Sequence, residues 1–306
     1  MITFLGIHLG RASFGARLLA ESGREIARAE QRFQGHTELE HALLDLVESW
    51  VARGSLHSVV IGLEKGHRSA LPLPQLKAKL EAEVALLTVP ATLSILLGAV
   101  PSGPGMLLSM GSNLRIATLD SSHSFRELRM QEGGGQWWSM ELSKLAQHSP
   151  RLSQAIAQHR SGPQLMKAVP RLLETGDYPS PDPVLKARLD KLSQTVAESC
   201  LNVASRLPGV RRLVLSGYLH PSPMSRRVLE ACEGALSLPQ PRFPAEVGAA
   251  LLGLALYKEN QERLHLGKPP ETGQFPATEW GASPVLLRRL FRLRRPFPEF
   301  PDENAS

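Results

Sequence analysis

Apolar and polar positions along the chain divide it into two halves that open in the same way. Near the N-terminus, the apolar runs predict three strands at residues 2–7, 13–19 and 25–33, with glycine turns between them. The pattern restarts at residues 106–110, where a strand, a returning strand and a third strand again precede helices. Such hairpin openings argue against a Rossmann domain, in which the first strand leads directly into a helix.

Helices and further strands follow each set of three strands. The alternation of the two element types predicts an α/β protein. In the first half the further elements are helices at residues 39–50, 73–83 and 92–97 and strands at 58–63 and 85–89. In the second half, the returning strand is at residues 114–120 and the third strand at 125–130. The further elements are a strand at 212–216 and helices at 138–147, 153–158, 164–174, 182–207, 225–233 and 244–257.

Composition narrows the class of protein. Of the 306 residues, 42% are hydrophobic and 21% charged, which predicts an ordinary folded core. The net charge of +6 favours anionic ligands, but only 5% of residues are aromatic, so we expect no nucleic-acid partner. The two cysteines, Cys200 and Cys232, are too few for a disulfide scaffold or a cysteine zinc site. We find neither a membrane-length apolar run nor a basic leader, and we expect a cytoplasmic protein.

Four short segments, taken in order, resemble motifs of the actin-like ATPase and sugar-kinase superfamily. GIHLGRAS from Gly6 resembles the first phosphate loop, and LSMGSN from Leu108 the second. RLVLSG from Arg212 is similar to the strand and turn that contact adenosine, and AEVGAA from Ala245 to the final helix beside the nucleotide. In length the match is closest to the BadF/BadG/BcrA/BcrD ATPases and N-acetylglucosamine kinases, and residues 101–112 also resemble FGGY carbohydrate kinases.

The resemblance implies an α/β fold of two ribonuclease H-like lobes, with ATP bound in an interlobe cleft. The lobes would comprise residues 1–100 and 101–262, followed by a Pro- and Arg-rich tail at residues 263–306. Glycine turns let backbone amides face phosphate oxygens because no Cβ stands in the way. The implied nucleotide-binding residues are Gly6, His8, Gly10, Arg11, Ser13, Gly111, Ser112, Asn113, Ser216, Gly217 and Gly248.

The reaction centre departs from the family at two positions. In the family, an Asp of the first loop orients Mg²⁺, and a second Asp accepts the proton of the acceptor hydroxyl. Here these positions are His8 and Ala91. Imidazole is a poor ligand for Mg²⁺, and Arg11 could neutralise phosphate but cannot hold a metal ion. We therefore expect no metal site of the usual kind, and binding of ATP rather than rapid turnover.

Other residues are candidates for the missing chemistry. Glu64, just after a strand end, is the first candidate for a replacement base and Glu132 the second, although each can also be an ordinary loop carboxylate. The loop GGGQWW resembles the glycine-rich loop of type II pantothenate kinases. It predicts a substrate contact at Gly134, Gly135 and Trp137; the alternative is a turn that leads into a helix, with Trp137 or Trp138 in the core.

The tail contains a segment, residues 285–295, in which five arginines alternate with apolar residues. This pattern predicts a helix that binds a protein partner or a membrane surface. The alternative is that the segment docks on its own protein.

These features indicate two classes of function. The first is a nucleotide-binding, carbohydrate-kinase-like transferase in which phosphoryl transfer from ATP to a small sugar or related hydroxyl is weak or lost. The second is a non-catalytic, pseudokinase-like scaffold or regulator that uses the two-lobed fold and the Arg-rich segment to bind a partner. The sequence does not indicate the acceptor substrate, and it leaves open whether the chain forms a homodimer.

Overall fold

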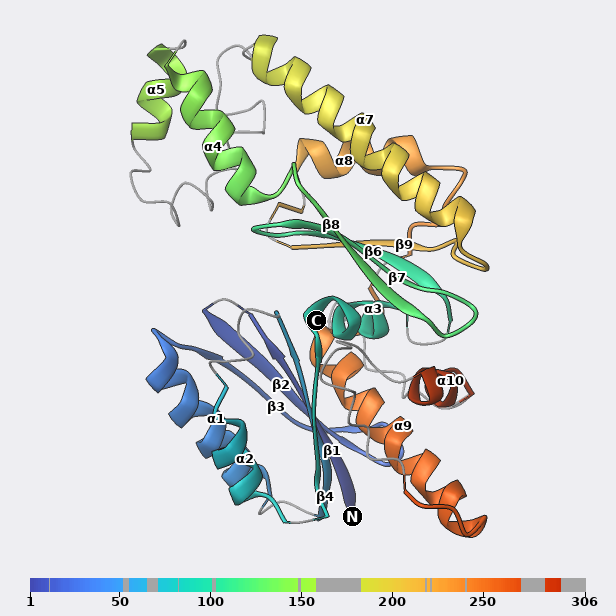
Figure 1. Cartoon of the computed structure of the whole chain (residues 1–306). Coiled ribbons are helices and arrows are strands. Elements are labelled where there is room, and N and C mark those ends of the chain that lie inside the picture. Colours follow the sequence, from blue (N-terminus) through green and yellow to red (C-terminus); the bar gives the residue numbers. More distant parts are fainter. Residues whose placement is uncertain are drawn as a thin grey trace, which may run out of the picture. The chain divides into compact units, whose positions relative to one another are not determined.

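The computed structural model (Figure 1) describes residues 1–10, 12–51, 55–64, 71–81, 83–100, 103–147, 150–157, 183–217, 219–220, 222–239, 241–270 and 284–292. Arg11 and the helix predicted at residues 164–174 lie outside the described residues. The chain divides into two compact units. Unit 1 comprises Met1–Gly103, His123–Phe125 and Pro241–Ser306, and unit 2 comprises Pro104–Ser122 and Arg126–Gln240.

Unit 1 contains a five-stranded sheet in the order β3-β2-β1-β4-β5. β2 runs antiparallel to β1 and β3, whereas β4 runs parallel to β1 and β5. The central strand β1 is apolar and buried because both of its faces are covered, while the edge strand β3 is charged and largely exposed. The strands are β1 (Ile2–Leu9), β2 (Ser13–Ala20), β3 (Glu25–Arg32), β4 (Ser55–Leu63) and β5 (Ala85–Pro90).

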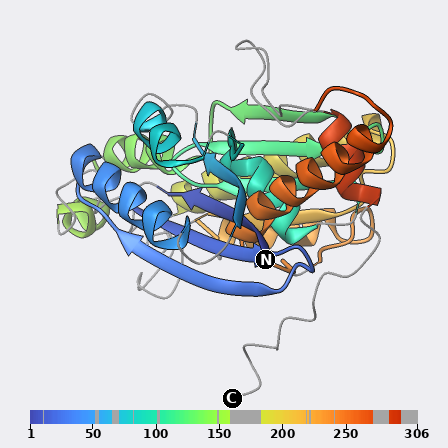
Figure 2. The same cartoon turned by 90° about the horizontal axis from the view of Figure 1, so that it is seen from below.

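Helices cover both faces of this sheet (Figures 1 and 2). α1 packs on one face through a stripe that includes Leu43, Val47 and Trp50, which recur at helical spacing. α9 packs on β1 and β4 from the other face and also contacts α3 and α10. The helices of unit 1 are α1 (His36–Val51), α2 (Leu73–Lys79), α3 (Ala91–Ala99), α9 (Ala245–His265) and α10 (Pro284–Arg292).

α9 is buried on every side along residues 247–257, so the segment AEVGAA has a packing role as well as its expected place beside a nucleotide. A helix that is apolar all round requires neighbours all round. Glycines make the closest approaches possible. A Cβ on Gly248 would lie 2.0 Å from the Ser94 carbonyl oxygen, and a Cβ on Gly6 would lie 1.9 Å from the Glu246 carbonyl oxygen.

The arginine-rich segment forms α10, which lies beside α9 in both views (Figures 1 and 2). Leu287 and Leu290 are fully buried, and Arg289 forms an ion pair with Glu262 of α9. The structure therefore shows the second of the two interpretations, a helix docked on its own chain. Binding of an external partner stays a prediction that would have to use the exposed arginines.

Unit 2 repeats the opening of unit 1. Its four-stranded sheet has the order β8-β7-β6-β9, with β6 antiparallel to β7 and parallel to β9. The predicted echo between the two halves is confirmed, because β6 to β9 take the same order as β1 to β4. The elements are β6 (Gly105–Met110), β7 (Leu114–Leu119), β8 (Phe125–Met130), α4 (Gly135–Ala146), α5 (Pro150–Ala157), α7 (Pro183–Arg206), β9 (Leu213–Ser216) and α8 (Pro223–Cys232).

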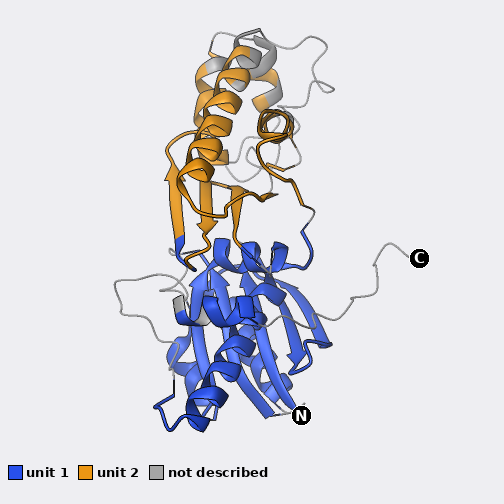
Figure 3. Cartoon of the chain, turned by 90° about the vertical axis from the view of Figure 1, so that its right-hand side faces the viewer, with its two compact units in different colours: residues 1–103, 123–125, 241–306 blue, residues 104–122, 126–240 orange. Residues whose placement is uncertain are grey.

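The division in Figure 3 differs from the expected boundaries at one point. From the sequence, residues 101–262 were expected to form the second lobe, whereas α9 belongs to unit 1. The reason is that β1, β4 and α3, on which the apolar surface of α9 packs, are all in unit 1. The chain thus leaves unit 1 after Gly103, touches it again at His123–Phe125 and returns to it at Pro241.

Candidate functional site

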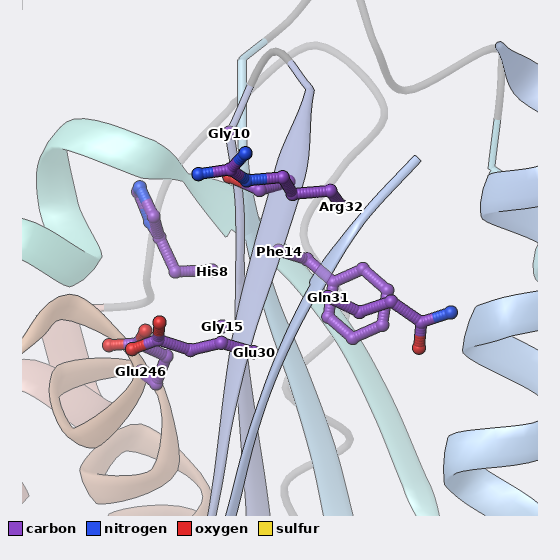
Figure 4. A pocket seen from close by; sticks show the side chains of 9 residues that line it. His8, Gly10, Phe14, Gly15, Glu30, Gln31, Arg32 and Glu246 are labelled. Carbon is purple, nitrogen blue, oxygen red and sulfur yellow. The ribbon is translucent and has the colours of Figure 1, made fainter. Parts of the chain in front are cut away.

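A row of three paired residues crosses β1, β2 and β3 and forms the floor of a pocket in unit 1. His8 is paired with Gly15, and Gly15 with Glu30. Residues two apart on a strand share a face, so Arg32, which is paired with Ser13, lies on the same face as Glu30. Figure 4 shows the side chains of His8, Glu30 and Arg32 on one side of β2 and those of Phe14 and Gln31 on the other. The strand register therefore gathers an imidazole, a carboxylate and a guanidinium.

His8 is held by a hydroxyl of α3. Its Nδ1 lies 3.2 Å from Ser94 Oγ, and Ser94 Oγ donates its only proton to the Ala91 carbonyl oxygen at 2.8 Å. Ser94 must then accept from His8, so we assign the proton of the imidazole to Nδ1 and a lone pair to Nε2. Burial lowers the pKa of His8 from 6.5 to about 4, so the ring is neutral near pH 7.

Glu246 closes the pocket from the first turn of α9. A Cβ on Gly15 would lie 1.8 Å from Glu246 Oε1, so the carboxylate rests directly on β2 where no side chain projects. Burial raises the pKa of Glu246; the neighbouring Glu30 acts in the same direction and Arg17 opposes it. Figure 4 shows the carboxylates of Glu246 and Glu30 on the same side of the strands.

The pocket has a volume of about 460 Å³, which is enough for a small organic ligand. It is lined by His8, Gly10, Ser13, Phe14, Gly15, Glu30, Gln31, Arg32 and Glu246 (Figure 4). Its chemistry is mixed: one guanidinium, two carboxyls and a neutral imidazole. No group of three His, Cys, Asp or Glu side chains within the described ranges is placed to hold a metal ion.

The expected position of the proton-accepting Asp also lies in unit 1. α3 begins at Ala91, directly after β5 ends at Pro90. Ala91 is buried and presents only a methyl group. Neither the methyl group of Ala91 nor the neutral ring of His8 offers a carboxylate at the positions where the resemblance implies one.

The predicted second phosphate loop of unit 2 contacts the predicted substrate loop. The amides of Gly135 and Gln136 donate to the carbonyl oxygens of Gly111 and Ser112 at 2.9 and 3.1 Å. In a trans peptide the carbonyl and the next amide point in opposite directions. The amides of Ser112 and Asn113 therefore point away from α4.

The same hydrogen bonds determine what the glycine loop can do. The first amides of a helix are the usual anion site, but here those of Gly135 and Gln136 bond to protein. A Cβ on Gly134 would lie 2.6 Å from Asn113 Cα, so this glycine is needed for packing of the two turns.

Gly217 follows β9 and packs on the same turn. Its φ is +100°, and a Cβ would lie 2.5 Å from the carbonyl carbon and oxygen of Met110. We expect Gly217→Ala to destabilise unit 2 by about 2 kcal/mol or more, because both the backbone conformation and the space favour glycine. Chemical denaturation monitored by circular dichroism measures this loss. Gly111→Ala is the matched control, since the atom nearest to its Cβ is 3.9 Å away; an equal loss in both variants would contradict the argument.

The candidate replacement bases lie in loops of different units. Glu64 is exposed directly after β4, and Glu132 is exposed in the turn before α4. Trp138 is fully buried in the core of unit 2, while Trp137 is half-buried with its ring centre 4.9 Å from that of Trp138. The alternative of a core tryptophan is thus seen at Trp138, and the substrate role of Trp137 stays a prediction.

The remaining predicted residues divide between the two units. Unit 1 holds Gly6, His8, Gly10, Ser13 and Gly248, of which His8, Gly10 and Ser13 line the pocket. Unit 2 holds Ser216, whose buried Oγ has no hydrogen-bond partner within the described residues, beside Gly217. Gly6 and Gly248 face helix backbone, so their expected contact with a nucleotide stays a prediction.

The three charged side chains of the unit 1 pocket, Glu30, Arg32 and Glu246, were not named as site residues from the sequence. Glu30 and Arg32 belong to an edge strand whose charges resemble those of any solvated strand. Counting the register outward from the hairpin turn at Gly10 would have aligned His8 with Gly15, whereas the pairing of Gly15 with Glu30 belongs to the next hairpin, whose register shifts between Leu18 and Leu19. The resemblance placed the segment AEVGAA beside the nucleotide, but it did not indicate that the Glu246 carboxyl would cover this row.

Comparison with known proteins identifies the fold. A structure described as a candidate N-acetylglucosamine kinase from Chromobacterium violaceum has a TM-score of 0.58 and 19% identity, covering 82% of this chain and 98% of that chain. A ROK-family glucokinase from Streptomyces griseus, solved with glucose and AMPPNP, has a TM-score of 0.51 and 11% identity, with 82% and 97% covered. A ROK-family transcriptional regulator, homologous to the E. coli Mlc protein, has a TM-score of 0.51 and 13% identity, with 95% and 81% covered.

The sequence itself matches no family model and no curated protein. The likeness is therefore one of fold, and it confirms the predicted α/β fold of actin-like ATPases and sugar kinases. Within the described part of the chain, no helix is long and apolar enough to cross a membrane.

Proposed function

We propose that this chain is a carbohydrate-kinase-like protein that binds an adenine nucleotide and transfers its phosphoryl group weakly or not at all. The observation that carries the proposal is the state of His8. Where the family resemblance places a Mg²⁺-orienting carboxylate, the chain has a neutral imidazole whose Nδ1 is engaged by Ser94.

Phosphoryl transfer at this centre would lack both of the carboxylates that the family resemblance implies. Phosphoryl transfer depends on positioning and on neutralisation of developing charge, for which a Mg²⁺ ion held by carboxylate and water is the common means. A neutral histidine offers no such anchor. With Ala91 in place of the general base, a further factor of about 10²–10⁴ in rate would be lost. Glu64 is the nearest candidate in unit 1 for a substitute base, because it follows the strand beside β1.

Nucleotide binding is the part of the proposal that unit 2 supports. The outward amides of Ser112 and Asn113 and the tight turn over Gly217 resemble a phosphate-binding turn. The glucokinase that shares the fold was solved with AMPPNP, a nucleotide analogue, and with glucose. A sugar or related hydroxyl compound is by the same comparison the proposed second ligand.

A non-catalytic regulator is the second candidate. The fold is also that of a transcriptional regulator, so its presence does not by itself require phosphoryl transfer. Loss of both carboxylates is what a descendant that only senses ligands would tolerate.

Thermal unfolding with ATP tests the proposal. We expect ATP to raise the melting temperature with no further increase from Mg²⁺, because a ligand that binds the folded state stabilises it, by about 2.7 kcal/mol at a hundredfold excess over Kd. We expect the formation of ADP from ATP to be slow in the same samples. A shift in melting temperature that requires Mg²⁺, together with rapid formation of ADP, would contradict the proposal. If ATP does not shift the melting temperature at all, the result would favour a regulator that binds other ligands.

A variant that restores the two charges serves as the positive control. His8→Asp combined with Ala91→Asp should make the ATP-induced shift depend on Mg²⁺ if the pocket end of β1 is where the metal would act. Circular dichroism must first establish that this variant folds, since burying a carboxylate is costly.

A further inference from the structure

The pocket of unit 1 carries opposite charges at two positions of one strand. Arg32 and Glu30 are two residues apart on β3, so their attachment points are about 7 Å apart on one face. Arg32 is paired with Ser13, next to the hairpin turn, and Glu30 with Gly15, where Glu246 arrives from α9. The positive end of the pocket is therefore at the turn, and the negative end is at the first turn of α9.

The negative end is built from two carboxyls that come from separate elements. Glu246 and Glu30 interact closely enough for Glu30 to disfavour the charged form of Glu246. Arg17 opposes this effect but is itself bonded to Glu25, with both N–O distances at 3.0 Å. An ammonium group placed between the two carboxyls would relieve their repulsion and satisfy their acceptor atoms.

The imidazole between the two ends adds a third acceptor. Because His8 donates its Nδ1–H to Ser94, the other ring nitrogen, Nε2, carries a lone pair and can accept a hydrogen bond. A neutral acceptor complements a ligand N–H and would not complement a phosphate oxygen. The side chains of His8, Glu30 and Glu246 thus present acceptors to the pocket, and the guanidinium of Arg32 is its charged donor.

We propose that this pocket binds a small zwitterion, with its ammonium group between Glu30 and Glu246 and its anionic group at Arg32. The ligand class is an aminoalkyl carboxylate or aminoalkyl phosphate whose charged groups are separated by a few bonds. The ammonium group also donates to the free nitrogen of His8. The pocket shares His8, Gly10 and Ser13 with the first predicted phosphate loop, whereas the nucleotide contacts proposed in unit 2 use other residues, so binding of the zwitterion and of ATP is measured separately.

Isothermal titration calorimetry on the full chain tests the proposal with 4-aminobutyrate and O-phosphoethanolamine as probes. Butylamine, butyrate and ethyl phosphate are the matched compounds that each lack one charge. We expect at least one zwitterion to bind about tenfold more tightly than every single-charge compound, since each charged group contributes a charge-assisted hydrogen bond. The better of the two probes then identifies carboxylate or phosphate as the anionic group. Failure of both zwitterions to bind at millimolar concentration would overturn the proposal.

Substitutions locate the binding. Glu30 and Arg32 are exposed, so Glu30→Gln and Arg32→Gln should leave the fold intact and weaken binding of the zwitterion about tenfold each. Glu83→Gln is the control, because it removes one exposed carboxylate of unit 1 outside the pocket. Equal affinity in Glu30→Gln and Glu83→Gln would place the ligand elsewhere and overturn the proposal.

Gly15→Ala provides a test that changes no charge. Its methyl group would occupy the place of Glu246 Oε1, so the carboxyl must leave the pocket floor. We expect binding of the zwitterion to be lost, while ATP binding, measured in a separate titration, is retained. Wild-type affinity for the zwitterion in a folded Gly15→Ala protein would show that Glu246 takes no part.

Discussion

Gly248→Ala is expected to destabilise unit 1 by about 3 kcal/mol or more, although alanine is the better helix former by about 1 kcal/mol. The added Cβ would lie 2.0 Å from the carbonyl oxygen of Ser94 and 2.5 Å from the amide nitrogen of Gly98. Both atoms belong to the backbone of α3, which cannot rotate out of the way. α9 and α3 would have to separate, and both helices would lose buried contacts.

Gly253→Ala, in the same helix, is the matched comparison. Its Cβ would lie 2.1 Å from Ser58 Oγ but 3.2 Å from Ser58 Cβ, so rotation of one hydroxyl relieves most of the clash. We expect the loss to be smaller than that of Gly248→Ala, measured by denaturant unfolding of both variants. If Gly248→Ala were as stable as the wild type, the close packing of α9 on α3 would be wrong.

Acidification from pH 6.5 to 4 is expected to remove about 3 kcal/mol of folding stability through His8 alone. The pKa of His8 is lowered from 6.5 to about 4 by burial, so between these values the unfolded chain binds a proton that the folded chain excludes. The stability contribution is present above pH 6.5 and is lost as the pH falls toward 4. Protonation would also leave a charged ring against Ser94.

His8→Asn isolates this effect. An amide keeps a neutral donor for Ser94 but does not titrate, so the pH dependence of unfolding should be shallower than in the wild type over this range. The raised pKa of Glu246 acts in the opposite direction, adding stability as the pH falls, and it is common to both proteins. Denaturant midpoints at several pH values give the difference, and parallel curves for the two proteins would contradict the pKa of His8.

The pocket of unit 1 differs in its charged groups from what the family resemblance implies. The two positions expected to carry carboxylates hold His8 and Ala91. Two carboxyls nevertheless line the same pocket, from β3 and α9. They face an imidazole acceptor and a guanidinium, a combination that complements a zwitterion better than a metal–phosphate complex.

Much of the local structure could be predicted from the sequence. The hairpin openings, the helix with Leu43, Val47 and Trp50 on one face, and the break at Gly217 follow from periodicity and from turn residues, which act over a few neighbours. Among the described residues, the element order was correct for the same reason. The end of α9 was placed too early, since a helix that is polar on the outside and docked by α10 continues to His265.

The sequence by itself thus determined the repeated β-hairpin openings, the glycine turns and the absence of carboxylates at positions 8 and 91. Only the tertiary structure decided which helix joins which unit, that the arginine-rich segment packs on α9, and that Glu30, Arg32 and Glu246 meet His8. The physical reason is range: turn and helix preferences depend on adjacent residues, whereas packing of α9 on Gly6 and Gly15 joins parts of the chain more than 200 residues apart. Those contacts depend on shape and excluded volume, which no local pattern records.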